Sequence, residues 1–587
     1  MNDSGYSRNA RLIQIKYREY LIPSVLTSAA LACASVVDSA IVGNLLGERE
    51  LAAIGACSPI IALVNALFMI FNIGGSTKAS VAMGEHDRES ADRYYSVDII
   101  VGLLVSAVFI VGMLIAAKPI TYMLSGSDEK LASLVIMYFR PVPFLLPALF
   151  LTLGMAQFMK IDGKPKMASY IALVSNAINL VLDYVLIKFV GLGLTGASLS
   201  TLLGYVFGIA LVLPWFLSKD KSFHFVNPFK GKFFSCLKTV LVGGSSRFFY
   251  HVSDFFKRII LNAIVLYCLG SPGLSVLTVC NSLLFFSTSI TNGGADAFLP
   301  IVGSLHGEKD HYGIRQCMRV ALIFVISGCV ILMAVMVIAP GFIAGLFGLE
   351  GGETEEIARF AIRVLAFAIP VMGIKTNLQN LYNTTGRSVL ASAMSILSGI
   401  AYLCLFAFGL SAISPNLFWL AFVCSEALTL LTVWVIGIII KKKEHTQGYL
   451  LLQPPDPDTR MVSFTLEADA ESAVGLSEKV RQGAMKILDD TNLANRLAMA
   501  IEEMTVAVAG NAKGNKKPLI DITITKTDEQ VSISFRDNSK PNNLLTLDTE
   551  DTTDSALSAE GMEVFKKIAK STAYSRQLGF NSILAKF

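Results

Sequence analysis

The feature that most constrains this chain is a series of long apolar segments that continues as far as Ile440. Each segment has roughly 20 residues or more, the length that a helix needs to cross about 30 Å of hydrocarbon. Of the 587 residues, 53% are hydrophobic and 16% are charged, a balance typical of membrane proteins. We therefore predict an all-α membrane part with twelve transmembrane helices, near residues 20–45, 53–77, 94–117, 131–158, 166–188, 192–217, 237–266, 273–298, 316–345, 355–383, 389–412 and 415–440.

Lysine and arginine gather in alternate loops between these segments. Basic residues mark the N-terminal stretch 1–19, the loop 218–236 and the end of the last segment at 441–443. Because basic loops stay on the cytoplasmic side of a membrane, this pattern predicts that both termini are cytoplasmic. The expected location is the plasma membrane, in a multi-pass arrangement.

Two pairs of loops reveal an internal repeat. The loop GEHDRESADR from Gly84 matches GEKDHYGIRQ from Gly307, and DGKPKMAS from Asp162 matches TGRSVLAS from Thr385. Both pairs share one offset of 223 residues (84 and 307; 163 and 386). We predict two six-helix halves of parallel topology, 20–217 and 237–440, with a substrate cavity between halves that rock against each other.

Two carboxylates lie deep in the first half. Asp38 and Asp183 are each about 25 Å along helices predicted to run in the same direction, at about 1.5 Å per residue. Asn179, four residues before Asp183, shares its helix face. Buried acids with amide and hydroxyl neighbours form a hard oxygen site suited to a proton or a small cation. The alternative is that each acid only forms a hydrogen bond with a neighbouring helix.

Several motifs in residues 21–440 together resemble the multidrug and toxic compound extrusion (MATE) transporters. They are Pro23, VVDSAIVGNLLGERELAAIG from Val36, GGSTKASVAMGEHD from Gly74, MKIDGKPKMAS from Met159, NLVLDYVLI from Asn179 and GLTGASLSTLLG from Gly193. The resemblance implies a secondary transporter that exports small organic compounds by alternating access, coupled to Na⁺ or H⁺. Carried over by motif position, the cation site comprises Asp38, Asn179, Asp183, Thr201 and Tyr138.

The second half departs from that pattern in GGSSRFFYHVSDFFKRIILN, from Gly243. Helical spacing places Arg247, His251, Asp254 and Arg258 on one stripe, where Asp254 has basic neighbours three and four residues away. The stripe is either a self-neutralised structural cluster or part of the cavity lining. In the cavity, its surplus of positive charge would disfavour simple cationic drugs and favour an anionic or zwitterionic substrate.

After a proline-containing linker, 441–460, the chain has the pattern of a soluble domain, 461–587. Alternating and helical periodicities predict the order β-α-α-β-β-α-β-β, with a helix in AEGMEVFKKIAKSTA from Ala559 and a closing hairpin through Gly579. We expect a cytosolic α+β sandwich.

The soluble domain resembles the GHKL ATP-binding fold, in particular the anti-sigma-factor serine kinases. AIEEMT, FRDNSKP and the glycine in GMEVF carry the resemblance, which implies nucleotide-binding roles for Glu503, Asp537 and Gly561. The family's Mg²⁺-binding asparagine is replaced by Ala507, and a methyl group cannot ligate Mg²⁺. A degenerate domain that binds nucleotide weakly, or binds a protein partner instead, is therefore favoured over an active kinase that uses ATP and Mg²⁺.

Together these patterns predict a cation-coupled antiporter for small organic compounds in a lipid bilayer, with a fused regulatory domain and no catalytic site. One alternative is a membrane sensor whose soluble domain phosphorylates or sequesters a partner. Another is a lipid-linked sugar flippase, which the DGKPK and NLVLD motifs disfavour. The net charge of +4 is explained by topology, so no nucleic-acid contact is expected.

Overall fold

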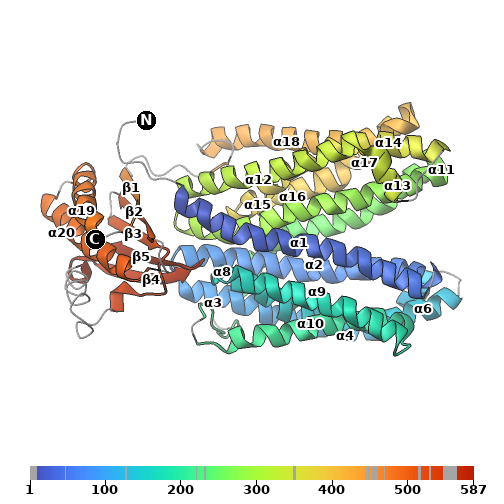
Figure 1. The fold of residues 1–587 in the computed structure, drawn as a ribbon, viewed down its shortest axis with the longest axis horizontal. Helices are drawn as coiled ribbons and strands as arrows, with labels where there is room; N and C mark the ends of the chain where they lie inside the picture. Colours follow the sequence, from blue (N-terminus) through green and yellow to red (C-terminus); the bar gives the residue numbers. More distant parts are fainter. Residues whose placement is uncertain are drawn as a thin grey trace.

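The structure is a computed structural model that describes residues 10–587, with gaps at 47, 126–128, 220, 230–232, 348–351, 445, 447–449, 453–459, 469, 489, 513–516, 528–529 and 547–564. It consists of an elongated helical bundle and a smaller domain with a β-sheet at one end of that bundle (Figure 1). We call this end of the bundle the domain-side end. Helix α1 runs along the middle of the bundle in this view, between the later helices on one side and α2 to α10 on the other.

The first half contains ten α-helices and three short stretches of tighter or wider helix. They are α1 (Arg11–Leu45), α2 (Glu48–Gly84), α3 (Arg88–Ser96), η1 (Val97–Val101), α4 (Gly102–Ile115), α5 (Ala117–Ser125), α6 (Glu129–Phe139), η2 (Val142–Phe144), α7 (Leu145–Leu149), η3 (Phe150–Gly154), α8 (Met155–Ile161), α9 (Pro165–Lys188) and α10 (Gly193–Leu217). The predicted span 94–117 is divided among α3, η1 and α4, and the span 131–158 among α6 to α8.

The second half begins with a very long helix, α11. The elements of this half are α11 (Phe233–Gly307), α12 (His311–Ile338), α13 (Pro340–Leu346), α14 (Gly352–Ala366), α15 (Ala368–Thr384), α16 (Ser388–Ile396), η4 (Leu397–Ala401), α17 (Tyr402–Ile413), η5 (Pro415–Trp419) and α18 (Leu420–Glu444). Within the described residues, nine helical segments are long and apolar enough to cross a membrane. The other three predicted spans, 20–45, 237–266 and 273–298, lie in α1 and α11, so the count of twelve stays a prediction.

Two predicted boundaries change in the structure. Helix α11 runs through two predicted spans, which are separated at Gly270, where φ is +63° and the backbone is not helical. Glycine tolerates this conformation because it has no Cβ. The span predicted at 316–345 ends at Ile338, since Pro340 lacks an N–H group and begins the separate helix α13.

Large apolar side chains cover the outside of the bundle. Val108, Ile338 and Ile413 are 74%, 79% and 75% exposed, and many other leucine, valine and phenylalanine side chains accompany them. Soluble monomers rarely expose apolar surface on this scale. The exposed belt is the surface that lipid is expected to cover.

The internal repeat is visible in the backbone. His86 and Lys309 both have positive φ, +60° and +57°, and Gly163 and Gly386 both have φ of +83°. Each pair is separated by the same 223 residues as the sequence repeat. Asp87 and Asp310, at that offset too, each cap the next helix through a backbone N–H three residues on. The two halves therefore have equivalent turns at equivalent positions of the repeat.

The halves touch at the domain-side end through glycines. A Cβ placed on Gly84 would lie 2.1 Å from the Ser304 carbonyl oxygen, and one on Gly307 would lie 2.0 Å from the Val81 carbonyl oxygen. Small residues of this kind let helix backbones approach closely. The end of α2 and the end of α11 are therefore in direct backbone contact, and the bundle is closed there.

The second domain is a five-stranded antiparallel sheet with two helices against it. Its elements are β1 (Arg460–Glu467), α19 (Ala470–Met485), α20 (Thr491–Gly510), β2 (Leu519–Lys526), β3 (Val531–Asp537), η6 (Leu544–Thr546), β4 (Ser571–Gln577) and β5 (Phe580–Lys586), and the sheet order is β1-β2-β3-β5-β4. Alternate strand residues such as Ile522 and Phe535 pack with α20 residues such as Leu497 in one core. Of the helix predicted from Ala559, residues 565–568 are helical, and Ser571 already begins β4, so the predicted end at Ala573 was wrong.

Candidate functional site

The two deep carboxylates of the first half meet. Asp183 of α9 is fully buried, and its carboxyl group shares a hydrogen bond with that of Asp38 on α1. A hydrogen bond between two carboxyl groups requires a proton on one of them, because two ionised acids at this distance repel. The pair is therefore a candidate site for a proton or a small cation between two helices.

Polar side chains of α9 and α10 surround Asp183. The Asn179 amide donates to Asp183 Oδ2 at 3.2 Å and lies 3.3 Å from the hydroxyls of Ser200 and Thr201. The Ser200 hydroxyl also contacts Asp183 Oδ1. Ser200 was missed from the sequence, although its place beside Thr201 in GLTGASLSTLLG was the available signal.

The geometry of this site depends on small residues. A Cβ on Gly204 would lie 2.7 Å from the Ser175 carbonyl oxygen and 3.0 Å from Asn179 Cβ, so α10 can approach α9 only with glycine there. Tyr138 of α6 lies close enough to interact with the charges of both acids. All five residues of the predicted cation site are thus brought together, and we call them, with Ser200, the acid-pair site.

The four residues of the stripe predicted in the second half do not all face the same surroundings. Arg247 and Asp254 line an open cavity, whereas His251 and Arg258 are absent from its described lining. Arg258 binds Asp254 at 2.8 Å, as the spacing predicted, and Lys257 binds it at 2.5 Å. Arg247 instead donates to Asn380 Oδ1 of α15 at 3.1 Å. The four residues therefore do not act as a single cluster.

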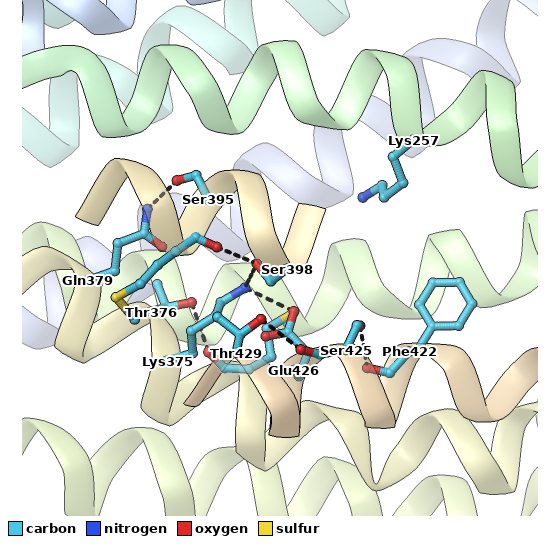
Figure 2. A network of polar contacts seen from close by, with 12 residues as sticks. Lys257, Lys375, Thr376, Gln379, Ser395, Ser398, Phe422, Ser425, Glu426 and Thr429 are labelled. Atoms are coloured by element: carbon cyan, nitrogen blue, oxygen red, sulfur yellow. Dashed lines mark hydrogen bonds and ion pairs between the residues drawn. The ribbon is translucent and has the colours of Figure 1, made fainter. Parts of the chain in front are cut away.

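A buried ion pair lies on the facing wall of the same cavity. Figure 2 shows the Lys375 ammonium between Ser398 and Glu426, 2.9 Å from each oxygen. Gln379, one helical turn further along α15, donates to Ser395 at 2.6 Å. Glu426 was not singled out from the sequence, where it is one acid in the apolar run of α18. We call this cavity the second-half cavity.

In the sheet domain, the residues expected to bind nucleotide contact their own neighbours. The Asp537 carboxylate accepts hydrogen bonds from the Ser539 backbone N–H at 2.8 Å and the Asn581 amide at 3.0 Å. Burial raises the pKa of Asp537, and the hydrogen bonds from Ser539 and Asn581 oppose that rise. Glu503 is half-buried on α20, and Gly561 lies outside the described residues.

The MatE family model matches residues 23–185 and 254–408, more than half of the chain. The chain belongs to the MatE family. The matched segments include both acids of the acid-pair site, whereas Arg247 and His251 lie between the two segments. Members of this family are secondary transporters, not enzymes, and in general use Na⁺ or H⁺ for coupling.

Curated relatives and solved structures agree with the MatE assignment. The multidrug export protein MepA of Staphylococcus saprophyticus is 23% identical over 448 residues, which cover 73% of this chain and 96% of the relative. MepA of a Staphylococcus aureus strain, MRSA252, is also 23% identical, over 65% of this chain and 84% of its own length.

Two solved structures share the fold. One is described as the outward-facing conformation of a multidrug resistance MATE family transporter of the MOP superfamily, with a TM-score of 0.68 and 19% identity over 75% of this chain and 99% of its own. The other is a MOP superfamily transporter from Pyrococcus furiosus, described as having a binding pocket of reverse polarity that suggests a different function. Its TM-score is 0.67 and its identity 18%, over 75% of this chain and 100% of its own. The chain is thus a multi-pass membrane protein with the MATE fold.

Proposed function

We propose that this protein is a cation-coupled antiporter that exports small organic compounds across the plasma membrane by alternating access. The family assignment supports transport, and the MepA relatives support multidrug export. The observation that carries the coupling proposal is that Asp38 and Asp183 meet in a site with a half-buried amide and two hydroxyls. Such a pair gains or loses one charge on binding a single cation, and that change can bias two conformations.

The coupling ion proposed is H⁺, with Na⁺ as the competing assignment. The shared hydrogen bond between the two acids needs a proton. The oxygens of Asp38, Asp183, Ser200 and Thr201 also form a donor set that suits a hard cation. Entry of Na⁺ would replace the proton and separate the carboxyl groups.

Flux of a MepA-type drug in proteoliposomes, under imposed H⁺ or Na⁺ gradients, tests the proposal. Coupling free energies of about 1–3 kcal/mol correspond to about 5- to 150-fold changes, so Asp183→Asn should lower gradient-driven flux by at least about fivefold. Asp92→Asn is the matched control, because Asp92 accepts a hydrogen bond from the His224 backbone N–H, far from the pair. Full gradient-driven flux in Asp183→Asn would disprove the coupling role of this residue, whereas absence of flux in the unmodified chain would favour the sensor alternative.

For the sheet domain we propose a regulatory role in a degenerate GHKL-like fold. The order of strands and helices supports that fold, and the bonds that Ser539 and Asn581 make to Asp537 occupy the group expected to recognise adenine. Ala507 supplies no ligand for Mg²⁺. Titration calorimetry of Mg-ATP into the full chain in detergent tests this, and micromolar affinity would show instead that the nucleotide site is intact.

A further inference from the structure

The second-half cavity has an excess of positive charge. Three cationic and two anionic side chains line it, namely Arg247, Lys257, Lys375, Asp254 and Glu426. Lys375 pairs with Glu426, and Asp254 pairs with Lys257. Arg247 has a neutral amide as its hydrogen-bond partner, and no carboxylate of the described chain pairs with it. An incoming molecule therefore meets one uncompensated guanidinium.

A free hydrogen-bond donor lies next to that guanidinium. Asn380 accepts from Arg247 through its oxygen, while its buried amide nitrogen has no partner among the described residues. Arginine and an adjacent amide N–H form a fork that matches the two oxygens of a carboxylate or sulfonate. A buried donor without a partner is costly, so a ligand oxygen there removes that cost.

The remaining wall suits an apolar body. Tyr250, Leu284, Met372, Leu403 and Phe422 line the cavity beside the charged groups. Ligand pockets are lined mainly by apolar and aromatic side chains with a few polar groups that fix orientation, and this lining has that character. In Figure 2, Lys257 reaches toward this space from α11, opposite Lys375 and Glu426.

We propose that the second-half cavity binds an organic anion with an apolar body, its carboxylate or sulfonate held by Arg247 and Asn380. The assignment rests on the proposed export function and names its substrate class. An organic cation would have to approach three basic side chains, two of which are already paired, so the cavity discriminates against it.

Binding of two dyes with one ring system tests this. Fluorescein is an anion and rhodamine 6G a cation, and their fluorescence anisotropy with the purified full chain in detergent reports affinity without any ion gradient. Fluorescein should bind more tightly. Arg247→Gln should weaken fluorescein binding about tenfold or more, and Arg247→Lys less, because lysine keeps the charge but loses the fork.

Arg359→Gln is the control, since Arg359 pairs with Glu355 on its own helix and is half-exposed. Equal binding of both dyes, or unchanged fluorescein binding in Arg247→Gln, would overturn the anion site. The anion site and the coupling proposal can fail separately. If rhodamine 6G is exported in an Asp183-dependent manner and fluorescein does not bind, the anion site alone is refuted. Fluorescein binding with flux indifferent to Asp183→Asn refutes the coupling alone.

A different set of contacts joins the sheet domain to both halves. In the first half, the Leu578 N–H donates to the Ile161 carbonyl at 3.0 Å, and a Cβ on Gly163 would lie 2.3 Å from the Gly579 nitrogen. Ser582 lies 3.4 Å from the His86 ring nitrogen. The hairpin of β4 and β5 therefore contacts two loops of the first half.

In the second half, the partner is the loop 307–311, in which the Glu308 and Asp310 side chains are largely buried. Arg536 of β3 forms an ion pair with Glu308, with both side chains 6% exposed, and lies 3.8 Å from Asp310. Gln577 donates to the other Glu308 oxygen at 2.7 Å. The loops 84–88 and 307–311 are equivalent in the repeat, so one sheet contacts the same element of each half.

Apolar contacts continue across this junction. Leu578 and Phe580 belong to one buried cluster with Leu12 of α1 and Ile301 of α11. The Lys16 ammonium lies 4.7 Å from the centre of the Phe580 ring. The docked domain thus shares a core with the bundle at the end where α2 and α11 are in backbone contact. Figure 1 shows β4 and β5 at this end of the bundle.

We infer that the sheet domain is a clamp that holds the two halves together at the domain-side end and slows transport while docked. This rests on the proposed alternating access, in which the halves must part at this end once in each cycle. Parting would break either the Ile161 and Gly163 contacts or the Glu308 ion pair, because one rigid sheet makes both.

Hydrogen–deuterium exchange and flux of the full chain test the clamp together. Arg536→Gln and Glu308→Gln should each raise deuterium uptake in 84–88, 161–164 and 306–311, and should speed drug flux by about two- to tenfold as the docked population falls. Combining Arg536→Glu with Glu308→Arg should restore both readouts. Arg481→Gln is the control, since Arg481 is exposed in the same domain and pairs with Glu478 on its own helix.

Unchanged uptake in both single variants would show that the ion pair does not hold the domain. Raised uptake with unchanged or slower flux would show that docking does not restrain transport, and either result overturns the clamp. Because exchange is measured without a gradient, this test remains informative if the coupling proposal fails.

Discussion

The residues that matter most in the bundle are acids and bases buried far from water. Asp183 and Lys375 illustrate two solutions: Asp183 has hydrogen bonds from Asn179 and Ser200, and Lys375 has the opposite charge of Glu426. Both arrangements avoid an isolated buried charge, which is very costly. They differ in their charges, since Asp183 lies among polar groups and a second acid, whereas Lys375 and Glu426 carry opposite charges.

Lys375→Met should therefore destabilise the protein strongly. It leaves Glu426 buried without its cation, and breaking a buried pair by removing one partner costs about 3–5 kcal/mol. Thermal unfolding of the full chain in detergent should show a clear fall in midpoint. The double variant Lys375→Met with Glu426→Gln removes both charges and should recover much of that loss; equal midpoints for the single and double variants would argue against a buried pair.

Two glycines at equivalent loop positions allow a matched comparison. Gly163 and Gly386 have the same φ of +83°, but a Cβ on Gly163 meets the Gly579 backbone whereas one on Gly386 meets nothing within 4 Å. Alanine at either site costs about 1–2 kcal/mol in the left-handed region. Gly163→Ala should in addition raise deuterium uptake in 161–164 and 306–311, and Gly386→Ala should leave 306–311 unchanged.

Among the elements, α2 is the one that joins the halves. Gly74 lies against Val240 and Gly84 against Ser304, so α2 packs along both segments of α11. Side chains larger than hydrogen cannot fit where the backbones touch. Glycine spacing on α2 therefore sets how completely this end of the bundle closes.

Gly84→Val should keep the domain-side end partly open. Its Cβ would lie 2.1 Å from the Ser304 carbonyl, so the helix ends must separate. We expect faster deuterium exchange in 81–88 and 303–311, together with lower thermal stability. Gly112→Val is the control, because a Cβ there meets nothing within 4 Å, and equal effects of the two substitutions would contradict the role of this contact.

For the whole molecule, His86 makes docking sensitive to pH. The pKa of His86 is lowered from 6.5 to about 4, mainly by burial and then by the charges of Arg536, Arg88 and Lys586, while the hydrogen bond with the Gly84 carbonyl opposes them. A depressed pKa in the docked state means that docking is strongest above pH 6.5 and weakens as pH falls toward 4, by at most about 3 kcal/mol.

Deuterium uptake in 161–164 and 306–311, corrected for the intrinsic exchange rate, should therefore rise between pH 7.5 and 5. His86→Gln should remove most of that rise, since glutamine does not titrate in this range. A rise of the same size in His86→Gln would assign the pH dependence to another group.

The sequence could predict this much because apolar length, basic loops and a repeated motif are local properties. They determined the membrane part, its two related halves, the depth of Asp38 and Asp183, and the order of elements in the sheet domain. Depth along a helix follows from the rise per residue alone, so two acids at equal depth could be matched before any contact was known.

Only the tertiary structure decided which faces meet. Ser200, Glu426 and the docking surface of the sheet domain were not found from the sequence, because each depends on which helix or loop lies opposite. Helical rotation and domain placement are set by packing between segments hundreds of residues apart. A pattern along one segment carries no information about its partner, so the cavity lining and the docking surface required the fold. The acid-pair residues could be named beforehand because the two acids lie at equal depth and the family motifs include their neighbours.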